Sequence, residues 1–413
     1  MSQAPHNVNS DSPFNSRVLA SADERVQVGV YNLPASQAIS LNSELRHELM
    51  IVNSASVPVF GSTFNIEIKD QNIQLQNVTL ALQTGPVVGT GLTGAFIPAY
   101  YWLNKIEILQ NNITMENCTG SWQFLLNNLN EFDDERTSIM QASGLYNSVA
   151  QRTTMSSQAG PNTFYINLKT YFDQTKLSLL SSQHNISIRV TLEPLASCYV
   201  ATAGVLTSCA ILSASAICSV TRLDSATAQE RLMRMYDNPF NHIMHTTYSV
   251  PYTLIAGSSS SIITLTTMVG NVAGLYFTLR ASVTGAGASV YSPITSFQIM
   301  NSSGANIVGG SYLPAPYCSN VLNSKTCKSS YNTETAYGIV NNNAYFYSYP
   351  FSCDILGAYA QGQALGCVNM KGQHQLQINY PTLPANSTYT LDVYGLVEHM
   401  IEQTPTSITK NKF

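Results

Sequence analysis

The stretch TFYINLKTYFDQTKLSLLSSQHNISIRVTLEP, from Thr163 to Pro194, decides the fold class of this chain. It holds two runs in which apolar and polar residues alternate, which is the period of a strand with one buried face. The apolar faces of the two runs carry Phe164, Ile166, Leu168, Thr170 and Phe172, and then Ile186, Ile188, Val190 and Leu192. The opposite face of the first run carries Tyr165, Asn167, Lys169 and Tyr171. Residues 173–184 are too many for a tight turn and include three leucines, so we expect a structured loop that packs between two half-buried strands.

The composition also favours a globular protein rich in β-structure. At 413 residues and 44% hydrophobic content, the chain can form two or three domains with cores of their own. Only 10% of the residues are charged, against about 25% in an average protein. With 19 Lys and Arg and a net charge of −4, no basic stripe is available for a nucleic-acid backbone, so we expect no direct nucleic-acid binding. So sparse a surface charge indicates that partner subunits cover much of the molecule.

The same alternation predicts further strands along the chain. They are expected at residues 64–68, 78–82, 101–109, 262–268, 275–280, 297–300, 345–351, 375–380 and 388–397. The phase slips near Gln76 and Asn77, which indicates a bulge or the start of a new strand. The whole pattern is that of an all-β protein.

Two helices and four loops interrupt these strands. Apolar residues at helical spacing predict one helix over residues 122–132, capped by Thr119 or Ser121. A second helix is predicted over residues 225–236, with Asp224 as its cap, and it marks the boundary between two domains. The expected loops are residues 85–94, 136–162, 281–293 and 309–343.

The two halves of the chain repeat each other weakly. The strands near Ile106, Phe164 and Ile186 have echoes near Phe297, Phe346 and Leu376, at offsets of about 180 to 190 residues. The economical interpretation is two tandem copies of one unit of about eight strands, each a jelly roll with Greek-key connections. The predicted division is an N-terminal arm (1–25), a first jelly roll (26–222), a linker helix (223–240), a second jelly roll (241–401) and a C-terminal tail (402–413).

Several motifs, in order along the chain, resemble one family. They are LNKIEILQNNITMENCTGSW (103–122), FYINLKTYFDQTKLSLLSSQHNISIRVTL (164–192), RLDSATAQERLMRM (222–235), PFNHIMHTTYSV (239–250), GNVAGLYFTLR (270–280) and ALGCVNMKGQHQLQINY (364–380). Together they resemble the double jelly-roll major capsid proteins of tailless icosahedral double-stranded DNA viruses, and in size the chain is closest to those of Polinton-like viruses. The first hallmark strand departs from the family because it lacks the usual Pro-Leu and Trp and has instead Asn167, Leu168, Tyr171 and Phe172.

The resemblance implies a structural protein of the virion and not an enzyme. Three chains would form a homotrimer whose six rolls give a pseudo-hexameric capsomer, and these capsomers would tile the icosahedral faces beside penton and minor capsid proteins. The N-terminal arm and the tail after Glu402, with Lys410 and Lys412, are candidates for inward contacts with minor proteins or an internal membrane. The N-terminal segment has no apolar core of signal-peptide length, so we expect synthesis in the host cytoplasm.

Two other classes of β-protein remain as alternatives. The first is a receptor-binding or carbohydrate-binding β-sandwich, such as a spike or a lectin. The second is a jelly-roll enzyme of the cupin type, which needs clustered metal-binding His and Glu inside its barrel. The seven histidines of this chain are scattered along the sequence, which argues against a cupin.

No motif in the chain predicts catalytic, cofactor-binding or metal-binding residues. The segment from Gly89 to Gly94 satisfies a GxGxxG pattern, but Pro98 and an aromatic run follow it where a phosphate-binding helix should begin, so a flexible loop is expected. The spacing of His242 and His245 could bring two imidazoles together on a helix, but no further ligands accompany them. The acidic residues 133–135 lack the alternating oxygen ligands of a calcium loop and are interpreted as a solvated helix end.

The cysteines and the uncharged segments predict structural roles. We expect the eight cysteines to be small buried apolar residues more than a disulfide framework, with Cys318–Cys327 and Cys353–Cys367 as the pairs to test. The uncharged residues 195–221 lack the sustained Leu, Ile and Phe content of a membrane span. Six Asn-X-Ser/Thr sequons are attributed to chance in an Asn-rich sequence.

Overall fold

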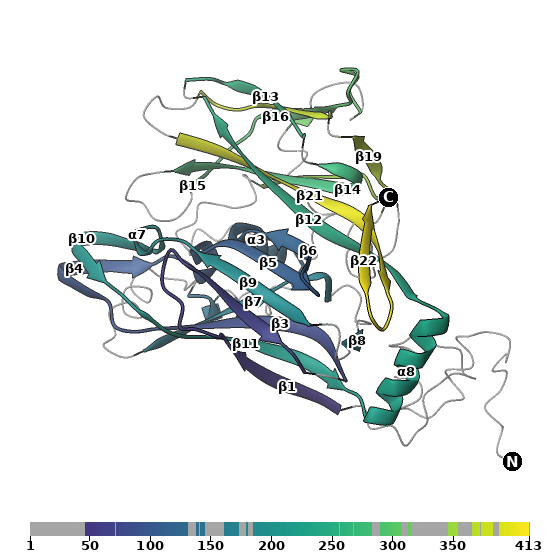
Figure 1. The fold of residues 1–413 in the computed structure, drawn as a ribbon. Helices are drawn as coiled ribbons and strands as arrows, with labels where there is room; N and C mark the ends of the chain where they lie inside the picture. The colour runs from purple at the N-terminus through teal and green to yellow at the C-terminus, as the bar shows by residue number, and fades with distance from the viewer. Residues whose placement is uncertain are drawn as a thin grey trace, which may run out of the picture.

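The computed structural model shows two β-sandwiches, one above the other, joined by a single helix (Figure 1). It describes residues 46–70, 72–130, 138–139, 141–144, 161–172, 179–180, 185–255, 257–266, 268–282, 290–307, 313–314, 346–353, 366–371, 373–382 and 388–412. Several predictions lie outside these residues: the arm 1–25, the acidic residues 133–135, Cys318, Cys327, one of the six sequons (Asn386), and most of the loops 136–162 and 309–343.

The first sandwich has the strand order of a jelly roll. One sheet runs β1 (Arg46–Asn53), β11 (Ile211–Arg222), β3 (Ile73–Thr84) and β7 (Asn162–Leu168). The facing sheet runs β2 (Thr63–Ile68), β9 (Ile186–Leu192), β5 (Leu103–Gln110) and β6 (Ile113–Cys118). Numbered one to eight along the chain, the strands stand in the orders 1-8-3-6 and 2-7-4-5, with every pair antiparallel. These orders define two Greek keys closed into a jelly roll.

The second sandwich repeats these orders. Its first sheet runs β12 (Phe240–Leu254), β21 (Thr388–Gln403) and β14 (Val269–Ser282), with β18 (Phe346–Pro350) beside β14. Its second sheet runs β13 (Ser260–Thr264), β20 (Gln375–Asn379), β16 (Ser296–Met300) and β17 (Leu313–Pro314). The strands β5, β7 and β9 occupy the same places in the first roll as β16, β18 and β20 in the second. The internal repeat predicted from the sequence is therefore confirmed strand by strand.

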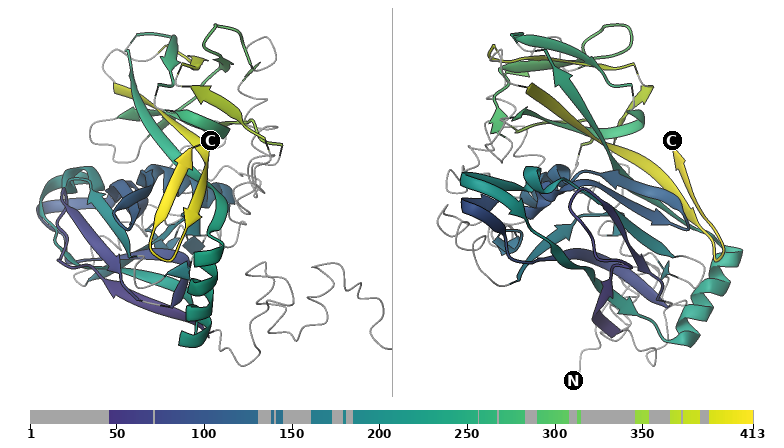
Figure 2. Two further views of the ribbon diagram at one scale, coloured as in Figure 1. Left: turned by 45° about the vertical axis from the view of Figure 1, so that its right-hand side comes forward. Right: turned by 60° about the vertical axis from the view of Figure 1, so that its left-hand side comes forward.

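Both rolls carry additional strands outside the eight of the jelly roll. In the first roll, β4 (Val88–Phe96) and β10 (Tyr199–Ser208) form a separate two-stranded ribbon, and β8 (Leu179–Leu180) pairs with β3. In the second roll, β15 (Val290–Ser292) and β19 (Val368–Lys371) pair with β14, and β22 (Ile408–Lys412) pairs with β21. The end of the described chain thus folds back onto the second roll, as the two views of Figure 2 show.

In the part of the chain that the structure describes, the named helices are few and short, as expected. They are η2 (Ala99–Trp102), α3 (Gly120–Asn130), α7 (Leu195–Cys198) and α8 (Ser225–Asp237). The Thr119 hydroxyl accepts from Trp122 N at the start of α3, and the Asp224 carboxylate accepts from Thr227 N at the start of α8, so Thr119 and Asp224 are the caps. None of the helices in the described part of the chain is long and apolar enough to cross a bilayer.

The stretch from Thr163 to Pro194 supplies one strand to each sheet of the first roll. In β7 the side chains of Phe164, Ile166 and Leu168 are buried, and β9 buries every second residue from Ile186 to Leu192, as predicted. The alternation fails after Leu168, where the strand ends. Tyr171, which was expected on the outer face, is buried, and its hydroxyl donates to Gln110 Oε1 at 2.7 Å.

The loop predictions 85–94, 281–293 and 309–343 were wrong where the structure describes strands within them, and the last of these contains β17. Residues 85–94 were expected to be a flexible loop, but Val88–Phe96 form β4, and Gly91 and Gly204 take left-handed φ values of 58° and 76° where the ribbon changes register. Glycine allows a bulged ribbon that alternation does not reveal. The expected loop 281–293 contains the end of β14 and all of β15. The phase slip at Gln76 is a bulge, because the β3–β11 register jumps from Leu75 to Asn77.

Candidate functional site at the joint between the rolls

Helix α3 of the first roll is wedged against the second roll. Trp122 is fully buried, and its Nε1 donates to the Thr247 hydroxyl of β12 at 2.7 Å. Its ring stacks on Tyr394 of β21 with centroids 4.6 Å apart and meets Tyr276 of β14 at 5.4 Å. Ser121 Oγ lies 3.0 Å from the hydroxyl of Tyr394. One helical turn therefore makes apolar and polar contacts with three strands of the other roll.

These contacts cover the outer face of the second roll's first sheet. Because side chains alternate along a strand, the face opposite the second core carries Thr247 on β12, Asp392, Tyr394 and Leu396 on β21, and Tyr276 and Thr278 on β14. All six are buried, with exposed fractions of 5% or less. In Figure 1 this sheet faces α3 and β6 of the first roll. The joint thus buries both faces of a sheet.

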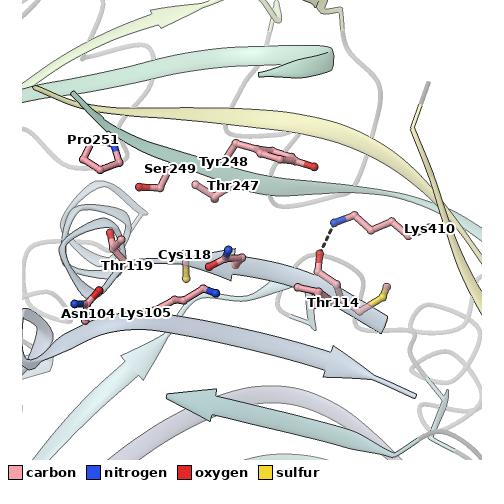
Figure 3. Close-up of a pocket in the computed structure, with 12 residues that line it drawn as sticks. Asn104, Lys105, Thr114, Cys118, Thr119, Thr247, Tyr248, Ser249, Pro251 and Lys410 are labelled. Atoms are coloured by element: carbon pink, nitrogen blue, oxygen red, sulfur yellow. Dashed lines mark hydrogen bonds between the residues drawn. The ribbon is translucent and has the colours of Figure 1, made fainter. Parts of the chain in front are cut away.

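The end of the chain clamps the two rolls together. Strand β22 pairs with β21 in the second roll, and Lys410 Nζ donates to the carbonyl oxygen of Met115 in β6 of the first roll (Figure 3). Ile408 is buried in the hydrophobic cluster that also holds the first core. The described C-terminal residues therefore take part in the joint.

A cleft of about 450 Å³ remains between the rolls beside this clamp (Figure 3). Its lining residues are Asn104, Lys105, Thr114, Met115, Asn117, Cys118 and Thr119 from the first roll, and Thr247, Tyr248, Ser249, Pro251 and Lys410 from the second. The ammonium of Lys105 is paired with Glu107 at 2.7 Å. Burial, with a further contribution from the charge of Glu116, raises the pKa of the Cys118 thiol far above its usual range, so this thiol is no nucleophile at neutral pH.

The histidine pair of the sequence lies on a strand. His242 and His245 belong to β12, and a spacing of three residues brings side chains together on a helix but not on a strand. His245 is buried, with Nε2 3.5 Å from Glu398 Oε1 on the neighbouring β21. Within the described residues, no three or more His, Cys, Asp and Glu side chains are grouped so that they could hold a metal ion.

The described cysteines are free thiols. Cys118, Cys198 and Cys218 are buried among apolar side chains, as expected. Cys353 and Cys367, one of the two pairs to test, are not bonded to each other. Burial, together with the nearby Glu398, raises the pKa of the Cys367 thiol to about 11.

Comparison of the sequence with protein-family models and with characterised proteins gives no match. Comparison of the structure gives clear ones. The chain is similar to the PBCV-1 virus capsid protein, with 15% identity and a TM-score of 0.64 over 91% of this chain and 99% of that one. The Faustovirus major capsid protein is 8% identical, with a TM-score of 0.64 over 89% and 92% of the two chains.

The mavirus major capsid protein is also similar, with 10% identity and a TM-score of 0.53 over 92% and 94% of the two chains. The chain has the double jelly-roll fold. The similarity extends over both rolls of this double jelly roll and over nearly the whole of each relative. At such low identity it establishes the fold, which is the fold expected from the sequence.

The sequence did not reveal the joint of the double jelly roll. Trp122 was predicted only as part of the apolar stripe of a helix, and β12 was not predicted as a strand. The available indication was the clustering of Tyr and Thr on 247–253, since such residues favour strands with polar tips at packed surfaces. Which helix they would meet depends on tertiary structure alone.

Proposed function

We propose that this chain is the major capsid protein of a tailless icosahedral DNA virus and builds the virion shell without being an enzyme. The observation that carries the proposal is the match of its fold, over 89–92% of the chain, to the PBCV-1, Faustovirus and mavirus capsid proteins. A fold alone does not imply a function, because jelly rolls also occur in lectins and cupins. The tandem pair of rolls, however, is matched over both copies, which a single lectin or cupin domain would not explain.

The joint supports a mechanical role. A shell subunit must hold its two rolls in a fixed relative position and orientation, because its shape determines how it packs in the shell. Trp122, the clamp of β22 and the covered sheet provide that fixed relation. Three such chains would form a homotrimer with six similar lobes, and a six-lobed capsomer tiles a hexagonal lattice of neighbouring capsomers.

The remaining partners are proposed from the same role. Penton and minor capsid proteins would complete the shell at its vertices and inner side. The division into arm 1–25, rolls 26–222 and 241–401, linker 223–240 and tail 402–413 remains our proposal for the chain. Because Lys410 is engaged with Met115 inside the chain, the arm is the stronger candidate for inward contacts with minor proteins or an internal membrane. Nucleic-acid contact is not proposed, because the chain carries so few basic residues.

Native mass spectrometry combined with electron microscopy of the expressed chain tests this function. We expect a stable trimer that assembles into shells. A monomer that binds glycans and never assembles would instead support the receptor- or carbohydrate-binding alternative.

The arm provides a separate prediction. Deleting residues 2–24 should leave capsomers intact but impair shell assembly, since the arm precedes the first roll in the proposed division and is proposed to contact other shell components. Particle counts by electron microscopy, at equal capsomer concentration, measure the effect. Normal particles from the deleted chain would contradict the inward role of the arm, and loss of the capsomer itself would show that the arm holds subunits together.

A further inference from the structure

The cleft beside the clamp is space that the contacts of the joint do not fill. Its volume of about 450 Å³ lies within the range of about 300–1,000 Å³ found for small-molecule pockets. Strands β5 and β6 line it from the first roll, and β12 and β22 line it from the second (Figure 3). A molecule bound there would contact both rolls at once.

The lining of the cleft is polar, and its only charges are positive. Of the twelve described residues that line it, two are lysines and none is Asp or Glu. Six more carry a hydroxyl or an amide: Asn104, Thr114, Asn117, Thr119, Thr247 and Ser249. Hydroxyl, amide and ammonium groups can all donate hydrogen bonds. Such a lining suits an oxyanion, whose oxygens accept hydrogen bonds and whose charge is opposite to that of the lysines.

The two lysines reach the cleft from different rolls. Lys105 lies on β5 and Lys410 on β22, and Figure 3 shows both side chains extending into the space between the rolls. Lys105 shares the carboxylate of Glu107, which is 2.7 Å away, with Arg189 on β9, whose guanidinium lies 3.6 Å from the same carboxylate. Lys410 donates to the carbonyl oxygen of Met115, a neutral acceptor.

These groups give this part of the joint an excess of positive charge. One carboxylate, Glu107, is shared by two cations, and Lys410 adds a third cation. On the side of the second roll, the buried Asp392 lies opposite Pro251 in the β12–β21 register, but it does not line the cleft. Like charges repel more strongly where water is partly excluded, so an anion placed between the lysines would be stabilising.

We propose that this cleft binds a small multivalent oxyanion, with the size and charge of an inorganic triphosphate, that bridges the two rolls. The cations come from two sides of the cleft, so an extended anion with several charged groups can contact both of them. A single phosphate ion would occupy only part of the volume. The site lies within one chain and does not depend on the proposed assembly into a shell.

Isothermal titration calorimetry of the full chain with sodium tripolyphosphate, at fixed ionic strength, tests the proposal. We expect one site per chain, and Lys105→Met should weaken binding by about 10-fold or more, because one charge-assisted hydrogen bond is lost. The matched control is Lys69→Met, because Lys69 also pairs with a glutamate two residues away, Glu67 at 2.6 Å, but lies outside the cleft. The control should bind as tightly as the wild type.

A second variant tests the cleft without removing a charge. Ser249→Leu places a larger apolar side chain in the cleft and keeps both lysines, so it should abolish binding, and circular dichroism confirms that each variant is folded. In the wild type, tripolyphosphate should also slow amide exchange in β6 and in the part of β12 that lines the cleft, since the ligand would hold the two rolls together.

The outcomes decide the proposal separately from the capsid role. Equal affinity in the wild type and in the Lys105 and Ser249 variants would show that tripolyphosphate binds the surface without using the cleft, and the site would be wrong. The absence of binding to the folded wild type would overturn it as well. Neither result would change the expectation of trimers and shells.

Discussion

At the residue scale, Trp122 is the side chain on which the two rolls depend. It comes from a helix of the first roll, and the described ring and hydrogen-bond partners of its side chain belong to the second. The indole is buried together with the hydroxyl that it meets, Thr247 Oγ1. A buried acceptor that loses its donor costs more than the net value of the hydrogen bond, because the group stays out of water.

That asymmetry gives a prediction for a mutant cycle. Trp122→Phe keeps an aromatic ring but leaves the Thr247 hydroxyl without this donor, and we expect a loss of about 1–3 kcal/mol in the free energy of unfolding. Adding Thr247→Val should cost little more, because both polar partners are then gone. Urea denaturation at one fixed protein concentration measures all four corners of the cycle. Strictly additive losses would contradict a direct coupling between the two residues.

At the scale of elements, alternation predicted strands with one face in a core and a more open second face, such as β9, and also β14 and β21, which bury both faces. β9 buries Ile186, Ile188, Val190 and Leu192 and leaves the residues between them half-buried, so its alternating sequence matches its environment. β12 has neighbours on both faces, the second core on one and the first roll on the other, so its polar and apolar residues do not alternate cleanly. The sequence could therefore predict two jelly rolls but not the joint. The joint depends on contacts between segments that are far apart in the sequence, such as α3 and β12.

The β4–β10 ribbon was missed for a different reason. Its turns depend on glycine, and Gly204 has φ of 76° with Gly91 O only 2.4 Å from where a Cβ would stand. A glycine-rich stretch of this kind is typical of a loop when the partner strand, more than a hundred residues away, is unknown. The same residues form a strand once β10 supplies hydrogen bonds.

The ribbon supplies a prediction with a matched control. Gly204→Ala and Gly257→Ala both place a side chain at a left-handed φ, 76° and 79°, which costs about 1–2 kcal/mol by itself. Nothing lies within 4 Å of the Cβ position at Gly257, whereas at Gly204 the backbone of Gly91 must move. We expect Gly204→Ala to destabilise the protein more and to speed amide exchange in β4 selectively. If both variants lower the thermal stability equally and change amide exchange equally, the backbone of Gly91 can move away from the new side chain at little cost.

At the scale of the whole molecule, the chain is one unit because its last strand returns to the joint. β22 adds to the edge of β21, buries Ile408 against the first roll's cluster and brings Lys410 to β6. The first and second rolls would otherwise be connected by α8 and by the α3 wedge. Because β22 contributes to the joint, the relative position of the two rolls is fixed only after residues 408–412 have paired with β21.

Ending the chain after Gln403 tests this clamp. Both rolls keep their eight strands and should stay folded, but the joint loses a strand, a buried isoleucine and a hydrogen bond, so amide exchange should rise in β6 and in the facing part of β12. Exchange in β9, inside the first sandwich, should stay unchanged. Lys410→Met, which keeps β22 and removes the ammonium that donates to Met115, is the control and should have a much smaller effect. If the shortened chain protects β6 as well as the full chain does, the rolls are held by α3 alone, and a rigid capsomer would have to be explained by contacts between subunits.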